Sequence, residues 1–361
     1  MGDLIYKQTH PYTDIFLARE KVKRLRFVAQ SDEAFHCVNL AQGIKAPIIR
    51  YQADPDPRHL TAVEYAFDDI EEAHGQPFGL YGGDEGLHGR GLTQGSELCS
   101  AVEMMFSLEK MLEITGNLDF ADRLELVAFN ALPTQVSDDY QTRQYYQQAN
   151  QVMCTQGKRN FFQENRGERI VYGLLTGYPC CTCNLHQGWP KLTQHLWMAS
   201  AGNGLAALVY APSKVTAEVA NGQTVTLTET TQYPFEDTIR FKIQTEASVN
   251  FPLHLRVPAW CKTSSLRLNG IQLKAEHDGN RLVIDRRWKD GDELVLELPA
   301  SIRTKRWEAN SVSVYRGPLL YALEMEETWT EHPDGYREVR SSSPWNFALI
   351  EDNLKNPDEG F

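Results

Sequence analysis

The spacing of apolar residues changes near residue 200, and no other feature of the chain constrains its fold as strongly. Before this point apolar residues recur every three or four positions, as in 98–112, which is typical of helices with one buried face. Beyond it they recur every second position, which is typical of strands. The sequence therefore predicts an α+β multidomain chain, with a helical domain over 1–200, a β-sandwich domain over 201–345 and a tail over 346–361.

The helical part is expected to form antiparallel helical hairpins, because short connectors rich in glycine and proline separate its periodic segments. One helix is predicted to begin at Ser100, which fits a capping box with Glu103, and to end at Gly116. Further helices are expected around residues 12–29, 35–52, 59–73, 117–131 and 187–200.

Short strands are expected throughout the second part of the chain. They are predicted at residues 205–210, 224–228, 239–243, 253–257, 265–268, 282–285, 293–298 and 312–315. Turn pairs such as Asn269-Gly270 separate them, which is typical of hairpins. This number and spacing of strands favours an antiparallel β-sandwich.

The charge of the chain argues against two classes of partner. Acidic residues outnumber basic ones by 48 to 36, for a net charge of −12. Nucleic acids and anionic membranes are bound by basic surfaces, so we expect neither as a partner. The sequence also contains no run near the roughly 20 apolar residues that cross a bilayer and no visible signal peptide. A cytoplasmic protein is therefore expected, and homo-oligomers remain open.

Three of the seven cysteines, Cys180, Cys181 and Cys183, lie within four residues. The Cα atoms of adjacent residues are only about 3.8 Å apart, which disfavours a disulfide between Cys180 and Cys181. Neighbouring thiolates can instead converge on a soft cation such as zinc. A metal site is the favoured interpretation. A turn of small buried residues and a redox pair of Cys180 with Cys183 are the alternatives.

Further ligands could come from Glu97 and Cys99, which precede the predicted helix. On an extended segment, residues two apart share a side, so both could face one ion. Taken alone, Glu97 would more often be a carboxylate in the first turn of a helix. The glycine-rich segment 82–95 carries Asp84 and Glu85, and is either a loop close to a ligand or an acidic surface loop.

Two other segments contain residues suited to a site. His36 falls in an apolar stretch, where a histidine is more often a core residue than a ligand. Tyr145 and Tyr146 are aromatic residues of the kind that line sugar sites, and they could equally be core residues.

Together these motifs resemble glycoside hydrolase family 127, whose characterised members are β-L-arabinofuranosidases. The matching motifs are His-Cys-Val-Asn at 36–39, Gly-Asp-Glu at 83–85, Gly-Ser-Glu-Leu-Cys at 95–99, Cys-Cys-Thr-Cys-Asn at 180–184 and Arg-Gly-Pro-Leu at 316–319. The Glu-x-Cys motif followed by paired cysteines is the specific part, and the other motifs are supportive.

The resemblance implies a zinc-dependent retaining glycosidase built on an (α/α)6 barrel. It implies that Glu97, Cys99, Cys180 and Cys181 bind zinc, that Cys180 is also the nucleophile and that Glu85 is the general acid/base. The implied partner is an oligosaccharide or glycan with terminal β-L-arabinofuranosyl residues.

The resemblance also implies that His36 contacts the sugar, and we assign Tyr146 to the same binding site. Cys183 departs from the family pattern, so a shifted register in which it is a ligand stays open. Family members have more helices before His36, which implies a partial (α/α)6 barrel here. The alternative function is a non-catalytic, zinc-stabilised carbohydrate-binding or interaction protein.

Overall fold

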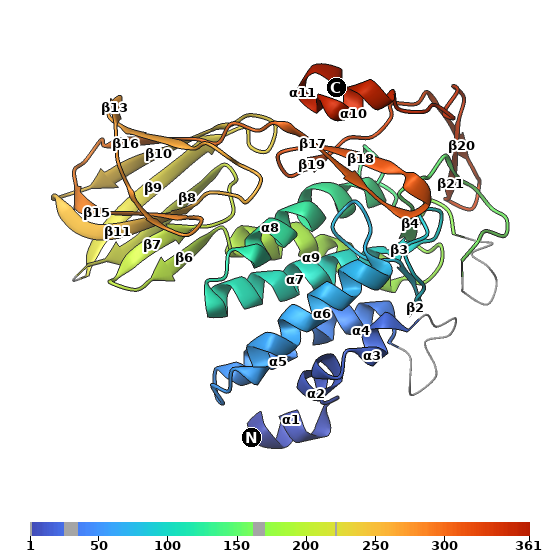
Figure 1. Ribbon diagram of the computed structural model, residues 1–361, viewed down its shortest axis with the longest axis horizontal. Coiled ribbons are helices and arrows are strands. Elements are labelled where there is room, and N and C mark those ends of the chain that lie inside the picture. The colour runs from blue at the N-terminus through green and yellow to red at the C-terminus, as the bar shows by residue number, and fades with distance from the viewer. Residues whose placement is uncertain (1, 25–34, 162–169, 221) are drawn as a thin grey trace.

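A computed structural model describes residues 2–24, 35–161, 170–220 and 222–361. Figure 1 shows helices in the first part of the chain and two large sheets at one end of the molecule. The helices before residue 200 are α1 (Gly2–Gln8), α2 (Tyr12–Leu17), α3 (Glu20–Lys23), α4 (Cys37–Gly43), α5 (Ala46–Tyr51), α6 (Arg58–His74), α7 (Leu98–Thr115), α8 (Asp119–Leu126) and α9 (Cys180–Gln194). Two short helices, α10 (Glu351–Lys355) and α11 (Pro357–Gly360), lie near the C-terminus. None of the helices in the described ranges is long and apolar enough to cross a membrane.

Several helices differ from their predicted bounds. The helix predicted over 12–29 is interrupted at Arg19, whose φ of 59° is incompatible with a right-handed helix, and its residues 25–29 lie outside the described ranges. The segment 35–52 divides into α4 and α5, and Pro47 lies in the first turn of α5, where its missing N–H is tolerated. The predicted helix over 117–131 is α8 continued by a π-helical turn at Val127–Ala131.

The observed ends of α7 and α9 can be compared with the ends predicted from the sequence. Gly116 caps α7 with a φ of 64°, which confirms the predicted end. The start at Ser100 is wrong, because the helix begins at Leu98 with Glu97 as its N-cap residue. The helix predicted over 187–200 begins earlier, at Cys180, and its predicted last turn is instead a strand, 197–200, which pairs with a neighbouring strand.

The two large sheets are formed by β6 (Trp197–Ser200), β7 (Gly204–Ala207), β8 (Ser213–Val219), β9 (Gln223–Thr231), β10 (Thr238–Thr245), β11 (Val249–Arg256), β12 (Ser265–Leu268), β13 (Ile271–Gln272), β14 (Glu276–Asp278), β15 (Arg281–Trp288) and β16 (Glu293–Glu297). One sheet has the order β13-β12-β16-β10-β9-β8 and the other β14-β15-β11-β7-β6. Buried side chains of both sheets, such as Phe241 and Phe251, belong to one apolar cluster, as in a sandwich. The pairing is antiparallel, as predicted, except that β7 pairs with β11 in parallel.

The strand predicted over 312–315 does not belong to these sheets. It forms β18 (Val312–Arg316), which pairs with β17 (Ile302–Arg306) and β19 (Leu319–Leu320) in a separate sheet. This sheet lies against the helical part, as Figure 1 shows, and the Tyr315 hydroxyl donates to the Pro77 carbonyl at 2.8 Å. The strand pattern was correct, but a period of two does not say which sheet a strand joins.

Two smaller sheets lie among the loops of the helical part. One consists of β1 (Gly83–Asp84), β2 (Gly86–Leu87), β3 (Ser96–Glu97) and β4 (Tyr146–Gln147), in the order β2-β1-β3-β4. The other consists of β5 (Met153–Cys154), β20 (Glu327–Glu331) and β21 (Arg337–Ser341). The first sheet contains three of the residues that the sequence marked as candidates for chemistry, Asp84, Glu97 and Tyr146.

Candidate active site and metal centre

Glu97 and Cys99 lie on either side of the junction between β3 and α7. Glu97 is extended, with φ −75° and ψ 139°, and the helix begins at the next residue. Both side chains are buried, at 1% exposure. The predicted extended lead-in is therefore present as far as Glu97, and the helix then turns the Cys99 thiol toward the same space.

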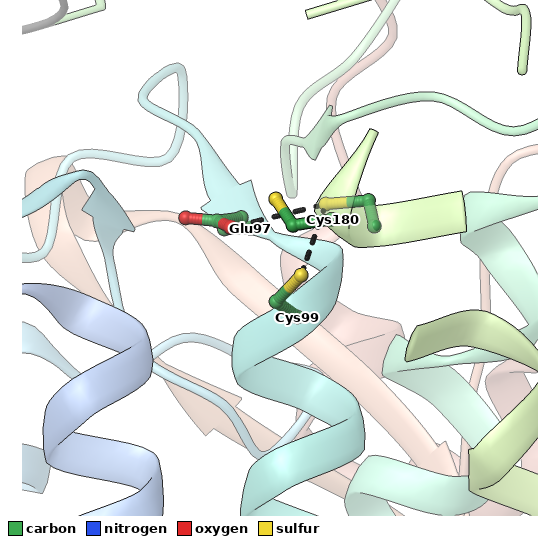
Figure 2. Close-up of side chains that lie close together, drawn as sticks. Glu97, Cys99 and Cys180 are labelled. Atoms are coloured by element: carbon green, nitrogen blue, oxygen red, sulfur yellow. Dashed lines mark hydrogen bonds between the residues drawn. The ribbon is translucent and has the colours of Figure 1, made fainter. Parts of the chain in front are cut away.

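Cys180 and Cys181 bring two further thiols to this point from the first turn of α9. Cys99 Sγ lies 3.4 Å from Cys181 Sγ, and Cys181 Sγ lies 3.8 Å from Glu97 Oε1. One ligand atom from each of these three residues and Cys180 lies within 4.8 Å of the others (Figure 2). Zn²⁺ binds four such ligands, with Zn–S bond lengths of about 2.3 Å, so this donor set fits a zinc ion.

The thiols of the cluster differ in their acidity and exposure. Burial raises the pKa of the Cys181 thiol, and a hydrogen bond with Cys180 raises the pKa of Cys99. Hydrogen bonds from Cys181 and Cys99 lower the pKa of Cys180, which is also exposed. The arrangement therefore favours a thiolate at Cys180, where an incoming molecule can reach it.

The Glu97 carboxyl group is costly to ionise because it is buried. Burial raises its pKa to about 7, and the nearby charge of Glu85 adds to the shift. A cation bound among these residues would offset that cost by favouring the ionised carboxylate.

Cys183 lies outside the converging set. Its side chain is exposed, and the groups of residues in the described ranges that could hold a metal ion do not include it.

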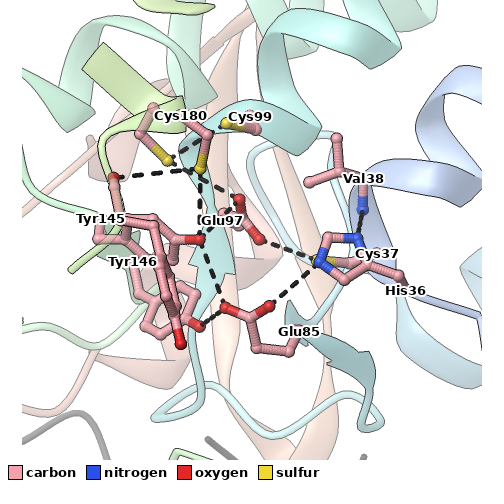
Figure 3. A network of polar contacts seen from close by, with 11 residues as sticks. His36, Cys37, Val38, Glu85, Glu97, Cys99, Tyr145, Tyr146 and Cys180 are labelled. Atoms are coloured by element: carbon pink, nitrogen blue, oxygen red, sulfur yellow. Dashed lines mark hydrogen bonds and ion pairs between the residues drawn. The ribbon is translucent and has the colours of Figure 1, made fainter. Parts of the chain in front are cut away.

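Glu85 lies at the turn between β1 and β2, with a φ of 86° that is uncommon for a residue other than glycine. Its carbonyl accepts from the Cys37 N–H at 2.7 Å, which helps to hold this conformation. Its carboxylate accepts from the Tyr146 hydroxyl at 2.7 Å and contacts His36 Nε2 at 3.1 Å (Figure 3). Burial alone would raise the pKa of Glu85, but the hydrogen bonds from His36 and Tyr146 outweigh it and lower the pKa.

His36 is not a core helix residue. It is the N-cap residue of α4, and its side chain is 28% exposed. Its Nδ1 accepts from the Val38 N–H at 3.2 Å, so in the neutral ring Nε2 carries the hydrogen and donates to Glu85.

Tyr145 joins the carboxylates to the thiols. Its hydroxyl lies 3.1 Å from Glu97 Oε1, 3.4 Å from Glu85 Oε1 and 3.7 Å from Cys180 Sγ (Figure 3). These last two contacts limit the separation of Glu85 Oε1 and Cys180 Sγ to at most about 7 Å, which allows the roughly 5–5.5 Å of a retaining pair. The sequence had marked Tyr145 only as one of an aromatic pair.

Cys37 is a second residue that the sequence analysis did not assign. It is fully buried, and its thiol donates to Glu97 Oε2 at 3.3 Å. The signal that the sequence offered was its place in the His-Cys-Val-Asn motif at 36–39.

Two family models match successive parts of the chain. The model described as the catalytic domain of β-L-arabinofuranosidase, GH127, matches residues 18–194, and the model of the GH127 middle domain matches residues 204–300. The chain belongs to glycoside hydrolase family 127. This confirms the resemblance drawn from the cysteine and glutamate motifs. No curated protein matches the chain.

Solved structures of family 127 share the fold. A GH127 β-L-arabinofuranosidase from Geobacillus stearothermophilus has a TM-score of 0.68 and 19% identity, with 88% of this chain and 55% of that chain covered. Another GH127 β-arabinofuranosidase has a TM-score of 0.69 and 18% identity, with 92% and 60% covered. The structure of a further glycoside hydrolase has a TM-score of 0.69 and 17% identity, with 96% and 68% covered. The chain thus spans 55% and 60% of the length of the first two.

Proposed function

We propose that this chain carries the catalytic centre of a zinc-dependent, retaining glycoside hydrolase that removes terminal β-L-arabinofuranosyl residues from an oligosaccharide or glycan. The observation that carries the proposal is the exposed Cys180 thiol, which joins a buried cluster of one glutamate and two cysteines within about 7 Å of Glu85. Membership of family 127 and the β-L-arabinofuranosidases among the solved structures support the choice of sugar.

We assign the fold accordingly: residues 1–200 form part of an (α/α)6 barrel, residues 201–345 contain the sandwich, whose strands end with β16, followed by β17–β21, which lie outside its two sheets, and residues 346–361 form a tail. Two separate clusters of buried apolar residues, one centred on the helices and one on the two large sheets, support this division. We also propose a reducing compartment such as the cytoplasm, because all seven cysteines are free thiols.

Glu97, Cys99, Cys180 and Cys181 would hold the zinc ion. When bound, the ion supplies positive charge that keeps the sulfur atoms ionised at neutral pH. This role suits a site whose thiols are otherwise kept protonated by burial, as Cys181 is.

The reaction then consists of two displacements. The Cys180 sulfur attacks the anomeric carbon while Glu85 gives a proton to the departing glycosidic oxygen, leaving the sugar bonded to Cys180. A water molecule next gives its proton to Glu85 and attacks the same carbon, and the carbon–sulfur bond breaks. Two inversions give net retention of the anomeric configuration.

The hydrogen bonds to Glu85 suit the second of these steps. His36 and Tyr146 keep Glu85 ionised in the ligand-free protein, which is the form of a general base. The first step needs a protonated Glu85. A sugar that takes over the hydrogen bonds of His36 and Tyr146 would raise the pKa of Glu85, and we therefore assign both residues to substrate binding.

The proposal is tested by measuring zinc content together with hydrolysis of p-nitrophenyl β-L-arabinofuranoside. We expect about one zinc per chain, and a first product of the same anomeric configuration as the substrate by NMR. Cys180→Ala should lower kcat by roughly 10⁴-fold or more, and Glu85→Gln by roughly 10²- to 10⁴-fold.

Cys183→Ala is the matched control, because it removes an exposed thiol from the same turn of α9 and should leave kcat unchanged. Equal losses in Cys180→Ala and Cys183→Ala would contradict the assigned nucleophile. Bound zinc without turnover of any arabinofuranoside would favour the alternative, a non-catalytic zinc-stabilised carbohydrate-binding or interaction protein.

A further inference from the structure

Arg143 is a fully buried arginine whose guanidinium is bound to one short segment of the chain, residues 174–182. Its nitrogens donate to the carbonyls of Thr176 at 2.8 Å, Tyr178 at 2.9 Å and Leu174 at 3.1 Å and to the hydroxyl of Thr182 at 3.0 Å. The guanidinium is planar and rigid, so its donors have fixed directions. One side chain therefore fixes the path of this segment at four points.

The side chains of this segment do little to hold it in place. Leu174, Leu175 and Tyr178 are each more than half exposed, so they bury little apolar surface. The Thr176 hydroxyl donates to the Val171 carbonyl at 2.7 Å, which is a local contact within the same loop. The hydrogen bonds from Arg143 therefore supply much of the attachment of the segment to the rest of the protein.

The contacts of Arg143 lie on both sides of Cys180. Tyr178 precedes Cys180 by two residues and Thr182 follows it by two, and Arg143 donates to both. The Cys180 side chain is exposed, so packing does not fix its place as it does for the buried Cys181. The position of the Cys180 sulfur therefore depends on the backbone that Arg143 holds.

Arg143 is also close in the chain to the residues that contact Glu85. Tyr145 and Tyr146 follow it by two and three residues, and their hydroxyls donate to the Glu85 carboxylate (Figure 3). The stretch 143–146 thus contacts Glu85 through its tyrosines and the segment that carries Cys180 through its arginine. This connection matters for a reaction between the two groups, because a displacement of about 1 Å can cost roughly 10²-fold in rate.

We propose that Arg143 is a positioning residue, which holds the segment 174–182 so that the Cys180 sulfur reaches a sugar bound beside Glu85. This inference rests on the proposed function, because it gives Arg143 a role in the same reaction. The four hydrogen bonds of Arg143 end on backbone carbonyls and the Thr182 hydroxyl, and none ends on a candidate catalytic or metal-binding atom. Loss of Arg143 should therefore change kcat and leave KM nearly unchanged.

The first test is the absorption spectrum of the full chain with cobalt(II) in place of zinc. Each thiolate bound to cobalt(II) adds to a charge-transfer band in the near ultraviolet. Arg143→Gln should lose about one third of this band, because one of three thiolates, that of Cys180, leaves the metal. Cys180→Ala gives the reference for that loss. Arg143→Lys keeps the charge but not the planar fork, and should lie between Arg143→Gln and the unmodified chain.

The second test is steady-state kinetics with p-nitrophenyl β-L-arabinofuranoside. Arg143→Gln should lower kcat by roughly 100-fold, with KM within about threefold of the unmodified chain. Thr182→Val removes one acceptor of Arg143 from a partly exposed position at nearly constant volume, and should lower kcat by about 3- to 10-fold. Leu175→Ala is the matched control, because it alters an exposed side chain of the same segment and should leave both the band and kcat unchanged.

Three results would overturn the proposal. The first is a full cobalt band and unchanged kcat in folded Arg143→Gln, or in both Arg143→Lys and Thr182→Val if Arg143→Gln does not fold. The second is a raised KM with unchanged kcat, which would place Arg143 in substrate binding. The third is an equal loss in Leu175→Ala, which would mean that any change in the segment has the same effect.

The two tests also separate this inference from the proposed function. A cobalt band without turnover in the unmodified chain would contradict the glycosidase, and the band of Arg143→Gln would still decide whether Arg143 places Cys180. Turnover by the unmodified chain that persists in Arg143→Gln would contradict only the role of Arg143.

Discussion

The thiol of Cys37 donates a hydrogen bond to Glu97 Oε2, at 3.3 Å, on the opposite oxygen from the one that lies near Cys181. The same carboxylate accepts from Tyr145 on Oε1. Each oxygen of Glu97 therefore has an assigned neighbour, and the carboxylate is held in one orientation toward the cysteine cluster. Hydrogen bonds of this kind orient metal ligands and tune their affinity.

We therefore predict that Cys37→Ala weakens zinc binding by about tenfold, because Glu97 loses the donor that orients it. Cys37→Ser, which keeps a donor, should retain most of the affinity. The measurement is competition of the zinc-loaded protein with a coloured chelator. Cys154→Ala removes another buried thiol, away from the cluster, and should behave as the unmodified chain. Unchanged retention in Cys37→Ala would contradict the prediction.

Tyr145→Phe removes the hydroxyl that lies between Glu85, Glu97 and Cys180. We expect kcat to fall by roughly 10- to 100-fold, together with weaker zinc retention, because the loss acts on residues that Tyr145 orients. Tyr178→Phe is the control, since this exposed ring packs against Tyr145 but its hydroxyl contacts none of these groups among the described residues. Similar effects of both substitutions would mean that ring packing, and not the hydroxyl, is what matters.

Arg256 joins the sandwich to the helical part. This fully buried side chain on β11 forms ion pairs with Asp122 and Glu125 of α8. Arg256→Met should lower the free energy of unfolding by about 3–5 kcal/mol, because it leaves a buried carboxylate unpaired. The check is urea denaturation.

The control for Arg256 is an ion pair on the surface. Arg240→Gln breaks the exposed pair with Glu293 and should cost at most about 1 kcal/mol. Adding Glu125→Gln to Arg256→Met should recover part of the lost stability. No recovery would mean that the cost arises from packing alone.

Glu229 should make the stability depend on pH. It is 2% exposed, and burial raises its pKa to about 8, while hydrogen bonds from the Ser213 hydroxyl and the Ala211 N–H oppose the shift. Between the ordinary pKa of a glutamate and this value, the unfolded chain loses its proton and the folded chain keeps it. Stability from this residue therefore falls as pH rises through that window, by up to about 5 kcal/mol.

The comparison is between the unmodified chain and Glu229→Gln, with urea midpoints at pH 5 and pH 8. The glutamine keeps an acceptor without a titrating proton, so its midpoint should decrease less over this interval. Parallel changes in both proteins would show that other groups cause the pH dependence.

The sequence predicted the local features of the fold because local spacing determines them. The period of apolar residues indicated α6, α7 and most strands of the sandwich, and Gly116 marked the end of α7. The sequence did not predict the break at Arg19 or the parallel pairing of β7 with β11, because these depend on contacts between distant segments. No strand was predicted at β8, although its side chains alternate between more buried and more exposed positions.

The candidate site divides in the same way. The sequence by itself determined which side-chain types the candidate site contains, a Glu-x-Cys pair and adjacent cysteines, and their order in the chain. Only the tertiary structure decided that α7 and α9 bring these groups within 4.8 Å, that Cys183 remains outside, and that Cys37 and Tyr145 contact Glu97. The physical reason is that a side chain's type is a local property, whereas its neighbours are set by the packing of segments some 80 residues apart, as for Cys99 and Cys181.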